Sequence, residues 1–325
     1  MSGQKTTRTI GSLQYDAGTK QTIEIDRDGV VLETVLNLEF TVTSGSGAIV
    51  GPLAQTLARL IKNIEMTYNG SDTFINIPGW QLALMRYHEL RGNPVLGMQS
   101  DVVLTGSTTA TTYRVVLKIP HFLPRARVPD DCANDLRDGR QCTLSILWGT
   151  IGDLFGTPGS GAAISNVSCV VGATYWVNAP AGKPFLLRTL NVTTDTITAT
   201  DPNFQMRVSK TAPGQGLRNL MITTTRNDVL VDDILSTIKL ESGSFTWQNN
   251  ADEVFQADMV EGLEIPPGNL VTGAYWLSPL IFAQLVTSIN LGELVADLDL
   301  QLGITSTSGT ERVHVLRESV RRPFI

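Results

Sequence analysis

Alternation of apolar and polar residues is the most regular feature of this chain. Every second residue is apolar in residues 36–42, 142–148 and 294–304. A half-buried β-strand produces this period of two, because successive side chains point to opposite faces of a sheet. Apolar residues three and four apart, as a helix requires, are confined to short stretches such as 80–90. The pattern therefore predicts an all-β chain with a few short helices.

One group of elements is predicted twice. Strand patterns at 62–68 and 73–77 flank a turn, and a helical pattern begins near Gly79. The same order returns in residues 231–262. The two copies align at a residue-number offset of 174, with the matched pairs Ile64 and Ile238, Met66 and Leu240, and Met85 and Met259. Few of the matched residues are identical, so the evidence for an internal duplication is the order and spacing of the elements.

Later strands align at a different offset. At an offset of 154, Leu144 and Ile146 fall on Leu298 and Leu300. An insertion of about 20 residues in the first copy, at 93–112, reconciles the two offsets.

The helix of the second copy carries its own start signal. Asn250 and Glu253 have the spacing of a capping box, so we expect this helix to begin at Asn250.

Glycine and proline mark the division of the chain into domains. The stretch 151–165 is rich in glycine, and it leaves two halves of similar length. We predict a first jelly roll over residues 1–150, a linker over 151–165 and a second jelly roll over 166–325. Two tandem eight-stranded antiparallel jelly rolls with short flanking helices are thus the predicted fold.

Composition and charge disfavour several classes of protein. Of the 325 residues 17% are charged and 42% are apolar, and the net charge of −6 disfavours an open basic surface for nucleic acid. The N-terminus has no apolar core of a signal peptide, so we expect the product to stay in the cytoplasm where it is made. The uncharged runs 154–182 and 265–292 contain prolines, and we expect neither to span a membrane.

Cysteines and histidines offer no recognisable metal or catalytic spacing. We expect buried free thiols at Cys132, Cys142 and Cys169. For the scattered histidines, a solvated or interface position is favoured over a ligand role; these are His88, His121 and His314.

The paired aspartates and the tryptophans could bind a ligand, but each group also has a purely structural interpretation. The carboxylate pairs at 130–131 and 232–233, with Asp135 or Asp138, leave calcium binding open, but turn and cap roles are favoured. Five tryptophans could line a sugar platform or pack the core, and the core is favoured; they are Trp80, Trp148, Trp176, Trp247 and Trp276. The chain is therefore not predicted to be an enzyme, and no cofactor is expected.

The repeated units at 61–70 and 234–243, together with the lengths of the two halves, resemble a known architecture. The chain resembles the double jelly-roll major capsid proteins of tailless, membrane-containing icosahedral bacteriophages, of the tectivirus and corticovirus type, which are related in architecture to the adenovirus hexon. The resemblance covers nearly the whole chain and contains no diagnostic motif. It implies a viral major capsid protein whose homotrimers form pseudo-hexameric capsomers of an icosahedral shell over an internal membrane.

The same resemblance implies binding partners and a localisation for the protein. Partners would be further copies of the chain, minor capsid and vertex proteins, and the internal viral membrane, with no specific nucleic acid. The protein would reside in the virion, after assembly in the host cytoplasm. The alternative from a different class is a two-domain β-sandwich that binds carbohydrate or acts as an adhesin.

Individual residues take roles by this analogy. Lys5 and Arg8 would face anionic lipid, unless they belong to a frayed polar terminus. Outward loops would come from 93–112 and 191–202. The C-terminal residues form a short basic tail that either contacts other subunits or is solvated; its candidate contacts are Arg317, Arg321, Arg322 and Phe324.

Overall fold

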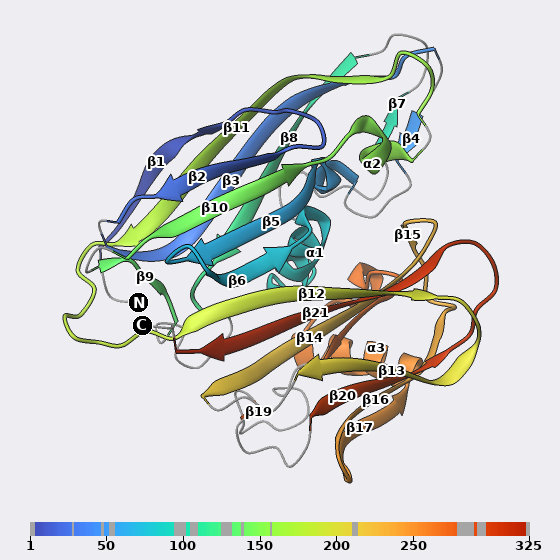
Figure 1. The fold of residues 1–325 in the computed structure, drawn as a ribbon. Coiled ribbons are helices and arrows are strands. Elements are labelled where there is room, and N and C mark those ends of the chain that lie inside the picture. Colours follow the sequence, from blue (N-terminus) through green and yellow to red (C-terminus); the bar gives the residue numbers. More distant parts are fainter. Residues whose placement is uncertain are drawn as a thin grey trace. The chain divides into compact units, whose positions relative to one another are not determined.

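Antiparallel strands make up most of the computed structural model of the chain (Figure 1). The structure describes residues 4–27, 29–46, 49–51, 56–93, 102–104, 110–124, 132–137, 140–156, 158–209, 214–277, 289–290 and 297–322. They form two compact units. The first unit extends to Arg188, and the second extends from Thr189 to Pro323 and includes Arg91–Asn93.

Two sheets of four long strands form the first unit. One sheet has, in spatial order, β1 (Lys5–Leu13), β11 (Ala163–Trp176), β3 (Val30–Thr43) and β8 (Ala110–Pro120). The other has β2 (Lys20–Ile25), β10 (Cys142–Trp148), β5 (Ile61–Tyr68) and β6 (Asp72–Ile77). Smaller elements are β4 (Ile49–Gly51), β7 (Val102–Leu104), β9 (Asn134–Asp135), the 3₁₀ helix η1 (Thr56–Leu60), and the helices α1 (Gly79–Glu89) and α2 (Ile151–Phe155).

The second unit has the same plan. One sheet has β12 (Leu187–Ile197), β21 (Glu311–Arg321), β14 (Gln215–Arg226) and β18 (Ala274–Leu277). The other has β13 (Asp201–Ser209), β20 (Leu298–Ile304), β16 (Leu235–Ser242) and β17 (Phe245–Ala251). The strands β15 (Val229–Leu230) and β19 (Ile289–Asn290) also pair with β14, and the helices are α3 (Asp252–Leu263) and the 3₁₀ helix η4 (Pro267–Asn269).

Strand order identifies both units as jelly rolls. If the eight long strands of a unit are counted along the chain, one sheet has the order 1-8-3-6 and the other 2-7-4-5, in both units. In this arrangement the first strand pairs with the last, as in a double Greek key. The predicted fold, two tandem antiparallel jelly rolls with short flanking helices, is confirmed.

The internal duplication keeps its register along the fourth long strand. Ile64 and Ile238 each face an apolar residue of the seventh strand, Ile146 and Leu302 respectively. The predicted offset of 174 is therefore confirmed. However, Ile146 of β10 corresponds to Leu302 of β20 and not to Leu300. The offset between these later strands is therefore 156, and the predicted offset of 154 is wrong.

A matched pair of hydrogen bonds gives the same two offsets. The amide of Gly149 donates to the carbonyl of Leu60, and the amide of Thr305 donates to that of Ile234, both at 2.8 Å. Leu60 and Ile234 differ by 174 in residue number, and Gly149 and Thr305 differ by 156. Backbone pairing therefore fixes the true alignment of the copies.

The boundary between the units differs from the predicted linker at 151–165. Residues 151–155 form α2, which Thr150 and Asp153 cap reciprocally. The last strand of the first jelly roll, β11, begins at Ala163; it pairs with β3 along its length and with β1 over its second half. The first unit therefore extends past the predicted limit of residue 150, and the chain passes to the second unit only after Arg188.

Two local predictions also need correction. The helix α3 begins after Ala251 because Asn250 pairs with Ile238 in the β16–β17 ladder, so the predicted cap at Asn250 is wrong. The expected outward loop at 191–202 is instead most of β12, a short turn and the start of β13. The other expected loop, 93–112, lies largely outside the described residues.

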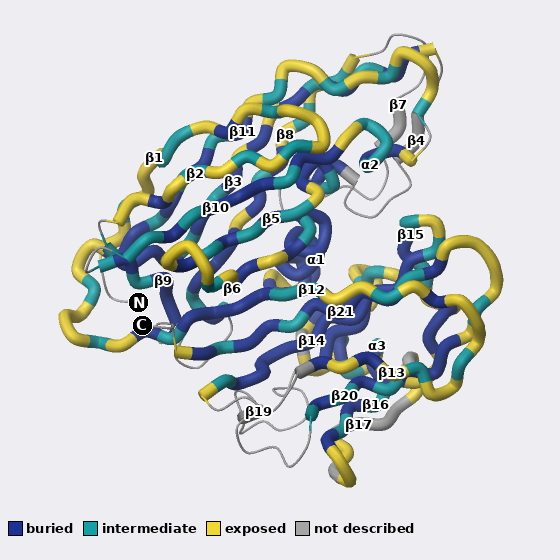
Figure 2. Tube along the Cα trace, in the orientation of Figure 1, coloured by how far each residue is buried: buried dark blue, intermediate teal, exposed yellow. Residues whose placement is uncertain are grey.

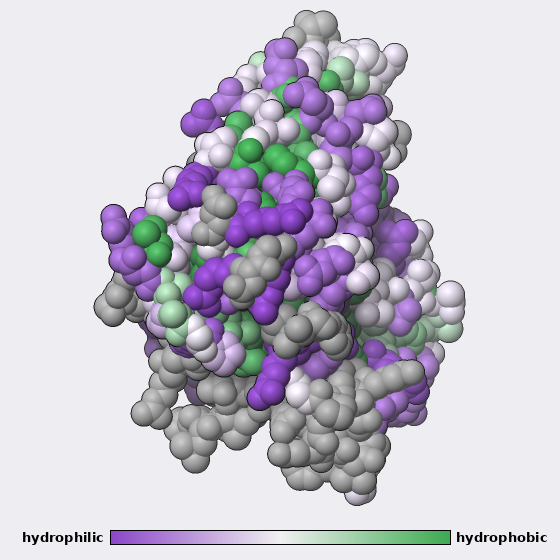
Figure 3. All heavy atoms as spheres, turned by 60° about the vertical axis from the view of Figure 1, so that its left-hand side comes forward, coloured by the Kyte–Doolittle hydropathy of each residue, from purple (hydrophilic) through white to green (hydrophobic). Residues whose placement is uncertain are grey.

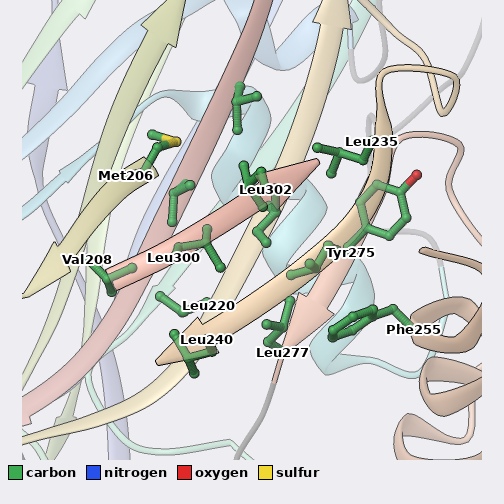
Figure 4. Packing of buried hydrophobic residues seen from close by; sticks show 14 of the residues in the cluster. Met206, Val208, Leu220, Leu235, Leu240, Phe255, Tyr275, Leu277, Leu300 and Leu302 are labelled. Atoms are coloured by element: carbon green, nitrogen blue, oxygen red, sulfur yellow. The ribbon is translucent and has the colours of Figure 1, made fainter. Parts of the chain in front are cut away.

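Each unit has its own apolar core. In the second unit, side chains from both sheets and from α3 meet in one cluster (Figure 4), among them Leu220, Leu302 and Phe255, each no more than 1% exposed. Burial of one such side chain contributes about 1.5–3 kcal/mol. In the first unit, α1 is buried along all eleven residues (Figure 2). The three cysteines are free and buried, as predicted.

Candidate functional site

Metal-ligating side chains do not gather in the part of the chain that the structure describes. There, no group of three or more His, Cys, Asp or Glu residues could hold an ion. Asp233 accepts two hydrogen bonds from Arg226, and Asp135 pairs with Arg137. Asp130, Asp131 and Asp138 of the open calcium interpretation lie outside the described residues.

The histidines are buried, so the expected solvated or interface position is wrong for all three. His88 donates from Nδ1 to the carbonyl of Leu84 at 2.9 Å, and burial lowers its pKa to about 4. His121 hydrogen-bonds Thr34 at 2.9 Å, and burial, with the nearby charge of Arg188, lowers its pKa to about 3.

His314 lies within the second unit. Its two ring nitrogens hydrogen-bond the hydroxyls of Thr194 and Thr225, at 2.9 and 3.1 Å. Hydroxyl partners supplied by distant strands allow the burial of His121 and His314, and sequence spacing gives no sign of these partners.

The tryptophans whose side chains the structure describes pack in the interior, as predicted. Trp148 is fully buried, and the exposed fractions of Trp80, Trp176 and Trp276 are 9% or less. A flat aromatic platform for sugar needs exposed ring faces. These four residues therefore do not form one.

A buried charge cluster holds the end of the first unit. The guanidinium of Arg188, fully buried, donates to Glu89 at 2.5 Å and to the carbonyl of Pro120 at 2.9 Å. Arg86 pairs with the other oxygen of Glu89. Because the carboxylate is paired on both oxygens, its burial is compensated. The cluster thus ties α1, β8 and the first residues of β12 together.

A second cluster closes one end of the second unit. Glu311 at the start of β21 pairs with Arg226 at 2.8 Å and accepts from the amide and hydroxyl of Thr307. Arg226 also binds Asp233 through two hydrogen bonds of 2.9 Å. The acidic side chains of both clusters are taken up by ion pairs and hydrogen bonds that hold elements of the fold together.

One end of the β1–β11 pair is basic and partly aromatic. Lys5 lies opposite Trp176 in the ladder, and the guanidinium of Arg8 lies 5.3 Å from the ring centre of Tyr175. Val177, which follows β11, is 50% exposed. We call these residues, with Arg137 and Lys183, the basic end of the first unit. Arg8 is therefore fixed in a strand, and a frayed terminus does not describe it.

The face of the molecule drawn in Figure 3 is mostly polar. In Figure 3 hydrophilic residues predominate over the visible described surface, and apolar residues show only in small patches. Among the described residues, every helix is too short or too polar to cross a membrane.

The expected basic tail is mostly a strand. Arg317 and Arg321 belong to β21, and Arg317 donates to the carbonyl of Val208 at 2.7 Å. Arg321 is buried, whereas Arg322, directly after the strand, is exposed. Phe324 lies outside the described residues. Arg317 and Arg321 are therefore held by the sheet and are not part of a solvated terminus.

Comparisons with solved structures find the same fold in viral capsids. The major capsid protein of Sulfolobus turreted icosahedral virus (STIV) matches with a TM-score of 0.75 at 17% identity, over 99% of this chain and 98% of the viral protein. The major capsid protein P2 from bacteriophage PM2 matches at 0.65 and 10%, over 99% and 98%. The PBCV-1 virus capsid matches at 0.67 and 13%, over 98% and 94%.

At these identities the likenesses establish the fold, which is the double jelly roll of the capsid proteins. Comparison with protein-family models gives no match. Comparison with curated protein sequences gives none either.

Proposed function

We propose that this protein is a viral major capsid protein, and that its copies tile an icosahedral shell. The observation that carries the proposal is the duplicated jelly roll with one strand order in both units, matched over nearly full length by capsid proteins. The fold alone would not suffice, because one fold hosts many functions. The burial of the three histidines and of four of the five tryptophans adds support, since these side chains offer no exposed ring face for sugar and no exposed imidazole.

A homotrimer is the proposed building block. Two jelly rolls in each chain give six in a trimer, and six similar modules around one axis produce a nearly hexagonal outline. Such pseudo-hexamers pack into flat facets, as a shell requires. Assembly needs no catalysis and no cofactor, so the proposed role is structural, in the virion after assembly in the host cytoplasm.

Two measurements on the purified protein test this proposal. Light scattering after size exclusion should give a mass of about 106 kDa, three times the 35.2 kDa of one chain. Electron microscopy should show hexagonal outlines with threefold features, and sheets or shells at higher concentration. A protein that remains a monomer at micromolar concentration and forms no lattice would contradict the proposal.

Contacts at the two chain ends are part of the proposal. The basic end of the first unit, with Lys5 and Arg8, would face the anionic headgroups of an internal membrane, where each cation contributes about 1 kcal/mol. The half-exposed Val177 supports this assignment, because an apolar side chain beside cations suits a lipid interface. Arg322, which is exposed directly after β21, is a proposed inter-subunit contact, and Phe324, which lies outside the described residues, is proposed as another. Minor capsid and vertex proteins complete the set of proposed partners.

A further inference from the structure

A pocket in the second unit contains a cation that no described acidic side chain neutralises. The pocket has a volume of about 250 Å³ and is lined by β12, β13 and β21. Its lining is partly apolar, from Met206, Val208 and Val315, and partly polar, from Asn191 and Thr193. Two arginines, Arg207 and Arg317, complete it.

Arg317 occupies a position at which the sheet otherwise places apolar residues. Along β21, Val313 and Val315 point into the core, and Arg317 follows at the same spacing of two. Its neighbour across the ladder is Leu220, which is also a core residue. The sequence pattern therefore directs this charged side chain toward the space between the two sheets.

The hydrogen-bonding capacity of Arg317 is largely unused. Nη1 donates to the carbonyl of Val208 at 2.7 Å. Nε is buried without a partner, and no described carboxylate forms an ion pair with this residue. Arg207, the other cation of the lining, pairs with Asp297 at 3.4 Å. Within the described residues, the positive charge of Arg317 is therefore uncompensated.

Such a charge is costly unless something neutralises it. Arg317 is partly buried, so its guanidinium loses part of its hydration, and this burial lowers the pKa of Arg317. A planar guanidinium also presents parallel N–H groups that match the oxygens of phosphate or carboxylate. An anion with two or more oxygens is the ligand that would satisfy both the charge and the free donors.

We propose that this pocket binds a compact oxyanion of the phosphate class, with Arg317 as its charged partner and Asn191 and Thr193 as its polar partners. The inference does not depend on the capsid function, because it rests on the chemistry of one pocket. A volume of about 250 Å³ holds such an anion together with several water molecules, each of which takes about 30 Å³. Free phosphate and the headgroup of a phosphate ester share this chemistry.

Thermal unfolding of the full chain measures this binding. The melting temperature of the wild type should rise saturably with inorganic phosphate at constant ionic strength, while chloride should have no such effect. Arg317→Met keeps length and apolar packing, and it should weaken phosphate binding at least 10-fold. Arg312→Met removes a cation of the same strand outside the pocket, and it should respond like the wild type. Glycerol 3-phosphate in place of phosphate distinguishes an ester headgroup from the free ion.

A second readout covers the case in which Arg317→Met fails to fold. Arg317→Lys keeps the charge but loses the planar fork, so it should bind phosphate more weakly than the wild type in isothermal titration calorimetry. In crystals soaked with selenate, anomalous density should lie beside the guanidinium of Arg317. Absence of saturable phosphate binding by the wild type, or an unchanged response of Arg317→Met, would overturn the proposal.

Discussion

The buried carboxyl of Glu311 predicts a specific dependence of stability on pH. Burial alone would raise its pKa, but hydrogen bonds from Arg226, Ser306 and Thr307 lower the pKa from 4.5 to about 2. Replacement by glutamine removes the titrating group and the ion pair with Arg226 while keeping the shape of the side chain. We therefore compare the wild type with Glu311→Gln over a range of pH.

The magnitude follows from linkage between protonation and folding. A carboxyl whose pKa is lower in the folded protein stabilises the fold above its unfolded pKa, and this contribution is lost as pH falls through the folded value. A lowering from 4.5 to about 2 corresponds to about 3 kcal/mol at pH 7, and roughly 1 kcal/mol of it remains at pH 3. Since the side chain of Arg226 is 21% exposed, solvent screening makes these values upper bounds.

Urea unfolding at pH 7, 5, 4 and 3 measures the effect. The difference in free energy of unfolding between the wild type and Glu311→Gln should fall from about 3 kcal/mol to about 1 kcal/mol over this range, because other carboxyls titrate equally in both proteins. Asp228→Asn is the control: it breaks the half-exposed ion pair with Arg312 and should cost no more than about 1 kcal/mol at pH 7. A difference between wild type and Glu311→Gln that stays constant from pH 7 to pH 3 would refute the reasoning.

Three further changes test the core, the buried ion cluster and the membrane-facing proposal. Leu302→Ala should lower the free energy of unfolding by about 2–5 kcal/mol in urea, and a loss below about 1 kcal/mol would contradict the burial of this residue. Arg188→Met should lower the free energy of unfolding by about 3 kcal/mol in the wild type but by much less in a Glu89→Gln background, because residue 89 then carries no charge. Equal losses in the two backgrounds would show that the pair is not coupled. Glutamine at both Lys5 and Arg8 should weaken binding to phosphatidylserine vesicles about 30-fold in flotation assays, at roughly 1 kcal/mol per charge, and vesicle binding that is unaffected would exclude these residues as membrane contacts.

Local pattern was sufficient to predict the repeated unit. The apolar positions Ile64 and Met66, and their counterparts Ile238 and Leu240, lie on the buried face of a strand in both copies. Because β5, β6 and α1 follow one another closely in sequence, short-range spacing fixes their order. The predicted all-β double jelly roll follows from this duplication.

Pairing between distant strands was not predictable in the same way. The glycine-rich stretch before Ala163 has the composition of a linker, yet β11 that follows it is held by β1 from the other end of the unit. Nothing local in 163–176 shows which sheet the strand will join. The predicted offset of 154 failed for a related reason, since apolar residues two apart look alike and only the ladder distinguishes Leu300 from Leu302.

The interior polar residues were the least predictable part of the candidate site. Arg188 and Glu89 come from distant parts of the sequence and form a buried ion pair. His314 likewise depends on hydroxyls from β12 and β14. Sequence reasoning favoured a solvated or interface position for His314, because the surface is the usual place for unpaired polar groups.

The two jelly rolls differ in length, most of all in one segment. The segment from Met85 to Cys142, the first residue of β10, is clearly longer than its counterpart from Met259 to Leu298, the first residue of β20. In the proposed trimer, long and short modules would therefore alternate around the axis, and a rotation by one sixth of a turn would not superimpose the tile on itself. A hexagonal tile of this kind has two sorts of edge, so neighbouring tiles can distinguish one orientation from the other. A chain that carries both modules can encode this direction, whereas six copies of a single module cannot.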